Sequence, residues 1–158
     1  MSRTHNYTVK TSWTGNRGSG TLDYRAYSRD HQITAEDKTS AIEGSSDPAF
    51  RGNPQRYNPE ELFVASLSSC HMLWYLHLAA VNGVVVLEYE DRAEGYMEES
   101  DDGAGRFTGI TLRPRVRIAD AEHLELADRL HDEAGKKCFI ANSVRVPLKY
   151  APEITVAE

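Results

Sequence analysis

The fold of this chain is decided by residues 58–81, which read NPEELFVASLSSCHMLWYLHLAAV. Asn58 suits the N-cap of a helix, and Pro59 suits the first helical position. The carboxylates of Glu60 and Glu61 then face the positive end of the helix dipole. The residues that follow are apolar around most of the helix circumference. We therefore expect a long helix that is buried and central to the fold.

The segment before this helix is predicted to be mostly β-strand. Residues 7–13 alternate in polarity and, with residues 21–27, predict a hairpin across a glycine-rich turn. A third short strand is expected at residues 32–34. Residues 35–57 contain glycines and prolines that exclude a long regular element, so we predict a loop there. A loop of that length in a compact domain is often functional.

The segment after the helix repeats the order of sheet and helix. Residues 84–97 predict a strand that turns at an Asp-Gly step and returns along residues 106–118. Asp120 is expected to cap an amphipathic helix that ends near Ala134. A last strand is predicted at residues 143–149, followed by a frayed tail. Runs of strands separated by single helices indicate an α+β domain with antiparallel sheets.

Length and charge limit the class of protein and its partners. A chain of 158 residues fits one domain and can bury a core without disulfides. Acidic residues outnumber basic ones 24 to 18, so we expect no nucleic-acid partner. The first ten residues, MSRTHNYTVK, have no apolar stretch after their charges. We therefore expect no signal peptide, no membrane span, and a cytoplasmic protein whose thiols stay reduced.

The two cysteines, Cys70 and Cys138, carry the chemistry that the sequence offers. A cysteine attacks as its thiolate, which nearby cations stabilise. Lys136 and Lys137 directly precede Cys138, whereas the helical neighbours of Cys70 are uncharged. The residues alone therefore favour Cys138 as the more reactive thiol. A buried and inert Cys70 is an equally compatible interpretation, because free cysteine is among the most buried residue types.

A metal site built from these thiols and the histidines is not expected. Cys70 and His71 are adjacent and face different sides of a helix. The chain has no C-x-x-C or H-x-x-x-H pair to supply the usual local ligand spacing. It also lacks the glycine motifs of phosphate and dinucleotide binding and the G-x-S-x-G nucleophile turn. We expect neither a metal nor an organic cofactor.

The segment from Asn58 to His71 resembles the OsmC and organic hydroperoxide resistance (Ohr) family. The similar features are the NPEEL start, a cysteine ten residues after the first Glu, and a second cysteine after a late amphipathic helix. The resemblance covers almost the whole chain and implies one OsmC-like domain over residues 1–158. Its segments are N-terminal strands and loop (1–57), central helix (58–82), strands (84–118), and second helix, second cysteine and last strand (120–150).

The resemblance also implies a function and an assembly. Members of the family are thiol-dependent peroxidases that reduce organic hydroperoxides and form intertwined homodimers. Carried over to this chain, Cys70 is the attacking thiol and Cys138 is the resolving thiol that closes a disulfide. Glu60 is the carboxylate that orients a substrate-binding arginine. The implied reductant is a dithiol of the lipoyl or thioredoxin kind.

Three positions compete for the arginine: Arg51 is the first choice, Arg29 the second and Arg17 the third. The chain also departs from the family at Phe139, because the family commonly has Pro directly after the second cysteine. These departures leave a rival hypothesis open. In it the protein is a non-enzymatic OsmC-like protein that binds a small apolar ligand, and both cysteines are structural.

The spacing of Glu60 and Cys70 adds a geometric constraint. Ten residues along one straight helix separate the two side chains by about 15 Å and place them on different faces. If both serve one site, either the helix breaks between them or Glu60 reaches the site of a second subunit. The second alternative predicts a homodimer.

Overall fold

The computed structural model describes residues 2–158, and the chain divides into two compact units. Unit 1 ends at Leu62, and unit 2 spans Phe63–Glu158. Helix α1, Pro59–Val81, begins at the end of unit 1 and continues through unit 2. The single domain expected over residues 1–158 stays a prediction.

Unit 1 contains a three-stranded antiparallel sheet in the order β1-β2-β3. Its elements are β1 Lys10–Trp13, β2 His31–Thr34, β3 Ile42–Gly44 and the short 3-10 helix η1 Pro48–Phe50. The two strands predicted at residues 7–13 and 32–34 are confirmed in position. The predicted polar loop also contains β3 and η1, so it is not wholly irregular.

The strand predicted at residues 21–27 is wrong, because these residues form turns and bends. The Asp23 carboxylate accepts a hydrogen bond from the backbone N–H of Arg25 at 2.8 Å, which closes a local turn. The guanidinium of Arg29 donates to the carbonyl oxygens of Tyr24 and Tyr27, both at 2.8 Å. These carbonyls are therefore not available to a strand ladder, and β1 pairs with β2 instead.

Unit 2 contains two three-stranded sheets of mixed direction, in the orders β4-β7-β9 and β5-β6-β8. The strands are β4 Val86–Asp91, β5 Glu94–Glu99, β6 Gly105–Leu112, β7 Pro114–Ile118, β8 Leu148–Tyr150 and β9 Glu153–Val156. β4 pairs antiparallel with β7, and β5 with β6. β8 and β9 pair parallel with β6 and β7, respectively.

Three strand predictions for unit 2 need correction. The segment 84–97 forms two strands, β4 and β5, which belong to different sheets. The sheets are not wholly antiparallel, because the chain after the second helix returns in the same direction as β6 and β7. Residues 153–156 do not fray, because their backbone pairs with residues 115–118. The predicted hairpin itself is confirmed by the pairing of β5 with β6.

Local sequence signals set both ends of α1, and the N-cap at Asn58 is confirmed as predicted. The Asn58 side-chain oxygen accepts from the backbone N–H of Glu61 at 2.8 Å, and the Glu61 carboxylate accepts from the backbone N–H of Asn58 at 3.0 Å. This reciprocal capping box satisfies two backbone donors at the start of the helix. Gly83, with a φ of 77°, follows its end.

The second helix, α2, spans Leu124–Lys137 and follows the 3-10 turn η2, Ala121–His123. The predicted helix is confirmed, but its cap is not: the Asp120 side chain makes no capping hydrogen bond. A further 3-10 turn, η3, spans Ala141–Ser143, where the sequence predicted the start of the last strand.

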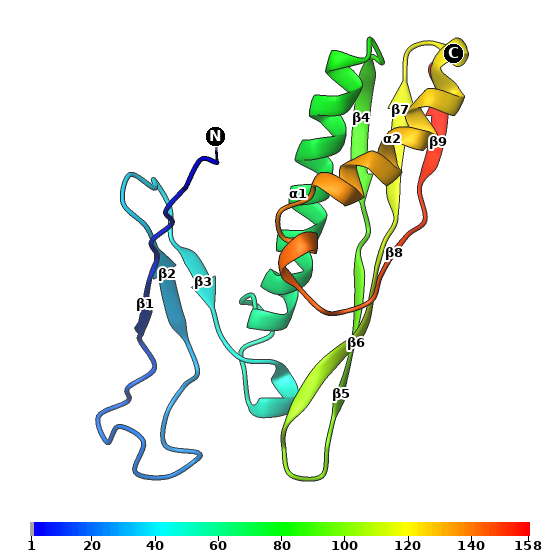
Figure 1. Cartoon of the computed structure of the whole chain (residues 1–158). Coiled ribbons are helices and arrows are strands. Elements are labelled where there is room, and N and C mark those ends of the chain that lie inside the picture. Colours follow the sequence, from blue (N-terminus) through cyan, green and yellow to red (C-terminus); the bar gives the residue numbers. More distant parts are fainter. Residues whose placement is uncertain (1) are drawn as a thin grey trace. The chain divides into compact units, whose positions relative to one another are not determined.

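Both helices pack against the β4-β7-β9 sheet, and the C-terminal end of α2 reaches α1 (Figure 1). The main core cluster joins the two helices to this sheet through Tyr75, Leu78, Ala79, Val84, Val116, Ile118, Ala127, Leu130 and Ala134. A second cluster joins α1 to β6 through Leu67, Ile110 and Leu112. The apolar interior of unit 2 therefore consists of two clusters, and α1 contributes to both.

The central helix is buried along one stripe only, which corrects the expectation of burial on all sides. Its buried residues recur at helical spacing and are Leu67, His71, Tyr75, Leu78 and Ala79. Leu73 and Val81 are 63% and 65% exposed. The sheets and α2 contact one side of the helix, so its other face remains apolar and exposed.

α1 is also long and apolar enough to cross a membrane by length and composition alone. Residues 62–81 contain no Asp, Glu, Lys or Arg, so the chain does contain an uncharged, mostly apolar stretch of that length, which the expectation of no membrane span overlooked. The central helix of a folded domain passes the same test, and α1 packs its buried stripe into the core of unit 2. The composition of one such helix is weak support for a membrane span.

Candidate active site

The two cysteines come from different helices and lie next to each other in unit 2. Cys70 is in the middle of α1 and is partly buried, whereas Cys138 directly follows α2 and is 1% exposed. Both are free thiols, and they are close enough that hydrogen bonding with Cys70 contributes to a raised pKa of Cys138. The fold thus brings together two thiols that are distant in the sequence.

The Cys138 thiol is protonated at neutral pH. Burial is the main cause that raises its pKa to about 11, and the neighbouring Cys70 adds to the increase. The backbone N–H of Ala141 donates to the Cys138 sulfur at 3.4 Å and opposes the shift only in part. The Lys137 ammonium lies 5.8 Å from the centre of the Trp74 ring. The expectation that lysines activate Cys138 is therefore wrong, because burial dominates its pKa.

Two buried histidines join the same helices beside the thiols. His71 follows Cys70 on α1, and His131 lies on α2 two turns before Cys138. The His71 Nε2 and His131 Nδ1 atoms are 3.0 Å apart, and the rings are stacked at 11° with their centres 5.3 Å apart. Their residues are 0% and 1% exposed. One ring therefore donates a hydrogen bond to the other inside the core.

Burial keeps both imidazoles neutral. It lowers the pKa of His71 to about 4, a shift that the carboxylate of Asp91 opposes. It lowers the pKa of His131 to about 3, and the nearby His71 adds to the decrease. The outer nitrogens, His71 Nδ1 and His131 Nε2, have no hydrogen-bond partner within residues 2–158. The pair is a neutral link between α1 and α2.

Tyr150 of β8 completes this cluster. Its ring stacks on His71 with the ring centres 4.8 Å apart. It also packs against Gly135 of α2, where a methyl group would lie 3.0 Å from Tyr150 Cζ and 3.1 Å from the hydroxyl oxygen. Burial, followed by the charges of Cys138 and Cys70, raises the pKa of Tyr150. Its phenol is therefore protonated at neutral pH and close to both thiols.

A second aromatic contact joins residues that are close in sequence to the two cysteines. Trp74, one turn after Cys70, meets Phe139, directly after Cys138, edge to face with the ring centres 5.5 Å apart. The departure at Phe139 thus places a ring, 66% exposed, against the central helix. Phe63, near the start of α1, packs on Phe107 of β6 with the ring centres 5.0 Å apart.

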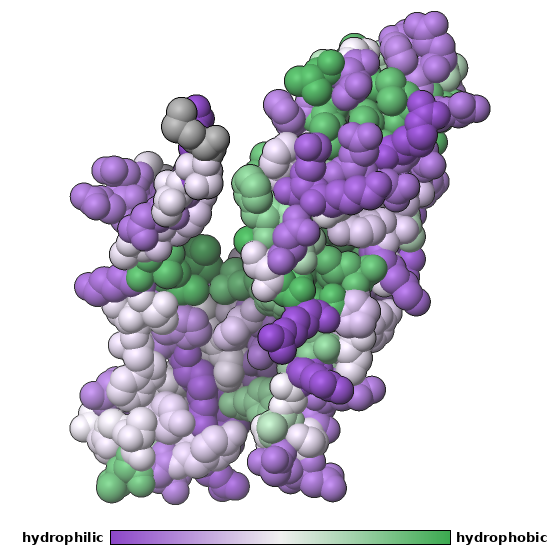
Figure 2. All heavy atoms as spheres, viewed as in Figure 1, coloured by the Kyte–Doolittle hydropathy of each residue, from purple (hydrophilic) through white to green (hydrophobic). Residues whose placement is uncertain are grey.

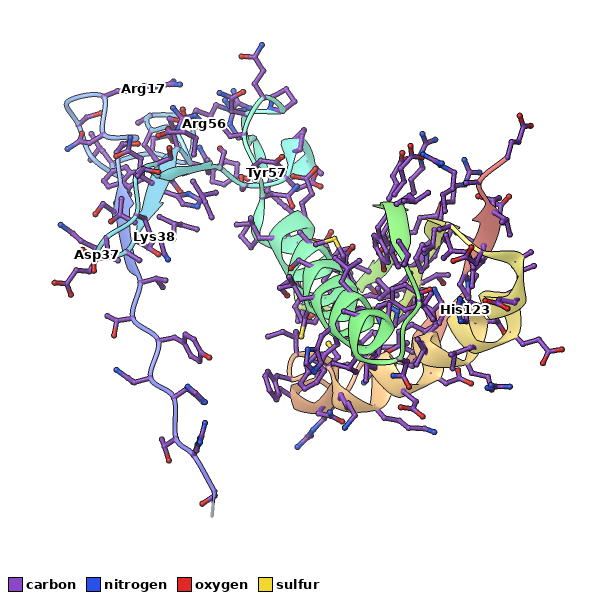
Figure 3. The ribbon with its side chains drawn as sticks, turned by 90° about the horizontal axis from the view of Figure 1, so that it is seen from above. Arg17, Asp37, Lys38, Arg56, Tyr57 and His123 are labelled. Atoms are coloured by element: carbon purple, nitrogen blue, oxygen red, sulfur yellow. The ribbon has the colours of Figure 1, made fainter. Side chains whose placement is uncertain are left out.

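The three arginines that the sequence offered line one hollow of about 320 Å³ in unit 1. The guanidinium of Arg29 is fixed by the carbonyls of Tyr24 and Tyr27 and lies 4.4 and 4.1 Å from the centres of their rings. Arg51 has a left-handed backbone, with φ 64°, and Arg17 lies on the loop between β1 and β2 (Figure 3). Within the described part of unit 1, neither Arg17 nor Arg51 forms an ion pair.

Glu60 lies in the first turn of α1 and is partly exposed. Within the described residues of unit 1 it pairs with none of these arginines, and the capping box is formed by its neighbour Glu61. No group of three or more His, Cys, Asp or Glu side chains within residues 2–158 could hold a metal ion.

The histidine pair and Tyr150 are not among the residues predicted from the sequence. A signal for the histidines existed, since His71 lies on the apolar stripe of α1 and His131 on that of α2. Nothing in the sequence near Tyr150 indicated its role, because its contact with His71 depends on the parallel pairing of β8 with β6.

These features define an α+β protein in which two helices bring a partly exposed and a buried thiol together on mixed sheets. The family model described as OsmC-like protein matches residues 52–151, so the chain belongs to the OsmC-like protein family. The membership expected from the NPEEL segment is thereby confirmed. A search of curated proteins found no match.

Solved structures agree with this assignment. The chain is similar to an OsmC-like protein of unknown function from Vibrio cholerae, with 32% identity, 96% of this chain and 100% of that chain covered, and a TM-score of 0.82. It shares its fold with an organic hydroperoxide resistance protein from Elizabethkingia anophelis (17% identity, 98% and 100% covered, TM-score 0.65). The organic hydroperoxide resistance protein OhrB of Bacillus subtilis also has this fold (21% identity, 94% and 98% covered, TM-score 0.59).

Proposed function

We propose that this protein is a thiol-dependent peroxidase that reduces organic hydroperoxides, with Cys70 as the attacking thiol and Cys138 as the resolving thiol. The observation that carries the proposal is the contact between a partly exposed and a buried free thiol on two helices. A peroxide from solvent can reach Cys70, whereas the buried Cys138 is available mainly to its neighbour. This difference in access assigns the order of the two roles.

The proposed cycle has three balanced steps. The Cys70 thiolate attacks the outer peroxide oxygen, the O–O bond breaks, and the alkoxide takes a proton to leave as an alcohol. The Cys138 sulfur then attacks the Cys70 sulfenic acid, which forms the disulfide and releases water. A dithiol reductant of the lipoyl or thioredoxin kind restores both thiols and becomes a disulfide itself.

The groups around the thiols support an organic peroxide as the substrate. Trp74, Phe139 and Tyr150 provide aromatic surface beside the pair, which favours an alkyl group over a second hydrogen on the peroxide. Two of the structures that share the fold carry the name organic hydroperoxide resistance protein. We assign the substrate-binding arginine to Arg51 before Arg29, because Arg29 is already held by two carbonyls.

We also propose that the protein is a cytoplasmic homodimer. Among the described residues of unit 1 no hydrophobic side chain is buried, and Leu22 and Tyr57 are 85% and 60% exposed. Hydrophobic residues are visible on the surface in Figure 2. A unit of this size needs apolar burial to be stable, and a second copy would supply it. The exposed face of α1, which includes Leu73, fits the same role. Glu60 would then serve the thiols of the partner rather than those of its own chain.

One observation favours a second candidate, a non-enzymatic protein that binds a small ligand. A hollow of about 620 Å³ in unit 2 has an apolar lining that includes Phe63, Phe107 and Val146, with Arg106 and Arg145 as its cations. Such a groove suits an amphipathic anion. In that case the cysteines are structural and remain unchanged when peroxide is added.

Substitution of each cysteine tests the proposed roles. Cys70→Ser should abolish peroxide consumption, whereas Cys138→Ser should consume one equivalent and then hold a sulfenic acid that dimedone traps. The wild-type protein should form no dimedone adduct once its disulfide has closed. Equal residual activity in the two variants would contradict the assigned roles. Peroxide consumption that is absent from the wild type as well would favour the ligand-binding candidate.

A further inference from the structure

We propose that Tyr150 is a further catalytic residue, whose hydroxyl passes a proton from the Cys138 thiol to the oxygen that leaves the Cys70 sulfenic acid. This inference rests on the proposed peroxidase function and concerns its second step.

The second step has a proton to move. Cys138 is buried and carries its proton at neutral pH, since its pKa is raised to about 11. It must lose that proton as the S–S bond forms, while the departing hydroxyl group must gain one to leave as water. The neighbouring imidazoles of His71 and His131 are poor bases, because their pKa values are lowered to about 4 and 3. A group that accepts the proton of Cys138 while it donates another to the departing hydroxyl group would serve both transfers.

Tyr150 is placed to be that group. Its hydroxyl lies against Gly135, which is one turn before Cys138 on α2. Its ring stacks on His71, the residue next to Cys70 on α1. The same side chain packs in the core cluster that contains Ile140, two residues beyond Cys138. The Tyr150 side chain therefore contacts both α2 and the α1 residue next to Cys70, and both thiols are close enough to raise the pKa of its phenol.

The chemistry of a phenol suits a relay. A phenol hydroxyl is both a donor and an acceptor. As the Cys138 S–H bond breaks, the Tyr150 oxygen receives that hydrogen and its own hydrogen goes to the leaving oxygen. The S–S bond forms, the S–O bond breaks, one water leaves, and tyrosine ends unchanged. The raised pKa of Tyr150 disfavours a phenolate and so favours transfer of both hydrogens together.

Gly135 supports the arrangement because it lets the ring approach α2. A methyl group at this position would lie 3.0 Å from Tyr150 Cζ, closer than nearly all side-chain contacts allow. Alanine at position 135 should therefore shift the hydroxyl while it leaves the phenol in the protein. The two residues provide independent ways to disturb the relay.

The test is a single turnover of the full-length wild type and of Tyr150→Phe with cumene hydroperoxide, quenched over time and analysed by mass spectrometry. Formation of the Cys70 sulfenic acid should occur at the wild-type rate in the variant. Closure of the disulfide should be slower by roughly 100-fold, the size expected for loss of a proton-transfer group. Closure in the variant should also accelerate with pH as Cys138 ionises, whereas wild-type closure should change little between about pH 6 and pH 9.

Two controls keep the outcome decisive. Tyr89→Phe removes another buried phenol, one whose raised pKa owes nothing to either thiol, and should leave both steps unchanged. Gly135→Ala should slow closure in the same direction as Tyr150→Phe. If Tyr150→Phe or Gly135→Ala fails to fold, the wild type still tests the proton relay, because formation of its disulfide should be slower in D2O than in H2O.

The outcomes separate this inference from the function on which it rests. If Tyr150→Phe forms the sulfenic acid rapidly and closes the disulfide at the wild-type rate, the relay is overturned and the peroxidase function is left intact. Closure in the wild type without a solvent isotope effect would overturn it as well. A wild type that never forms a sulfenic acid would remove the peroxidase function, and the relay with it.

Discussion

His71 and His131 form a hydrogen bond of 3.0 Å between their ring nitrogens, and this bond joins α1 to α2 inside the core. Tyr75 stacks on His131 with the ring centres 3.9 Å apart, and Tyr150 of β8 stacks on His71 with the ring centres 4.8 Å apart. The pair occupies the same region as Cys70 and Cys138. The relative placement of the thiols therefore depends on two polar side chains in an apolar interior.

This pair predicts that the protein loses stability in mild acid. Each histidine takes up a proton near pH 6.5 in the unfolded chain but only near pH 4 or 3 in the folded protein. The unfolded state binds more protons between these values, so stability is fully present above pH 6.5 and is lost as the pH falls towards 4. The urea midpoint should drop between about pH 7.5 and pH 5.

His77→Gln provides the matched control for that experiment. His77 lies on the same helix but is exposed, so its loss should leave the acid dependence unchanged. An equal urea midpoint at both pH values in the wild type would contradict a buried neutral pair.

Substitution at the pair should show strong coupling. His131→Leu leaves a buried nitrogen of His71 without its partner and should lower the free energy of unfolding by about 1–3 kcal/mol. The double variant His71→Leu/His131→Leu removes both polar groups, so it should lose less than the sum of the single variants. It should also be less sensitive to acid. Additive losses, measured by urea unfolding at neutral pH, would show that the bond does not link the two residues.

The raised pKa of Cys138 predicts slow alkylation in the folded protein. With a pKa of about 11, only about 0.1% of this thiol is ionised at pH 8, and the residue is 1% exposed. Iodoacetamide at that pH should modify Cys70 and reach Cys138 only after urea unfolds the chain. Peptide mass spectrometry gives the extent of labelling at each site. Equal labelling of both cysteines in the folded protein would show that Cys138 is accessible and ionised.

The capping box predicts a measurable cost at the start of α1. Asn58→Ala removes the acceptor for the Glu61 N–H and should lower the free energy of unfolding by about 1 kcal/mol. Asn58→Asp retains a capping oxygen and should differ from the wild type by only a few tenths of a kcal/mol. Thermal or urea unfolding of the three proteins measures this difference. A cost of the same size in both variants would assign it to packing around this buried residue instead.

The arginines of unit 1 should separate into a structural and a functional one. Arg29→Gln removes two hydrogen bonds to carbonyls and two ring contacts, so it should destabilise unit 1. Arg51→Gln breaks no hydrogen bond or ion pair within the described chain, so it should leave stability nearly unchanged. It should lower kcat/KM for an organic hydroperoxide by roughly 10-fold or more. The reverse pattern would make Arg29 the substrate-binding residue.

Local signals in the sequence predicted the fold where local interactions decide it. Asn58, Pro59 and Gly83 bound α1 because capping and turn formation depend on neighbouring residues. The Asp-Gly turn predicted the β5-β6 hairpin for the same reason. Residues 21–27 have strand-like composition, but the guanidinium of Arg29 binds their carbonyls. That contact cannot be read from alternating polarity.

The candidate site was predicted in part. The family resemblance selected Cys70 and Cys138, and the fold brings them together, whereas local charge alone favoured Cys138, whose pKa is raised. Lys136 and Lys137 are close in sequence, but burial has the larger effect on Cys138. Tyr150 and the histidine pair depend on contacts between distant segments, so no local pattern could have joined them.

The most direct test of the proposed function is the redox state of the two cysteines after peroxide treatment. The reduced protein is mixed with one equivalent of cumene hydroperoxide, blocked with iodoacetamide under denaturing conditions, and analysed by non-reducing mass spectrometry. We predict loss of both free thiols and a peptide pair joined by a disulfide between Cys70 and Cys138. Two cysteines that are fully alkylated and unlinked after this treatment would contradict the peroxidase function.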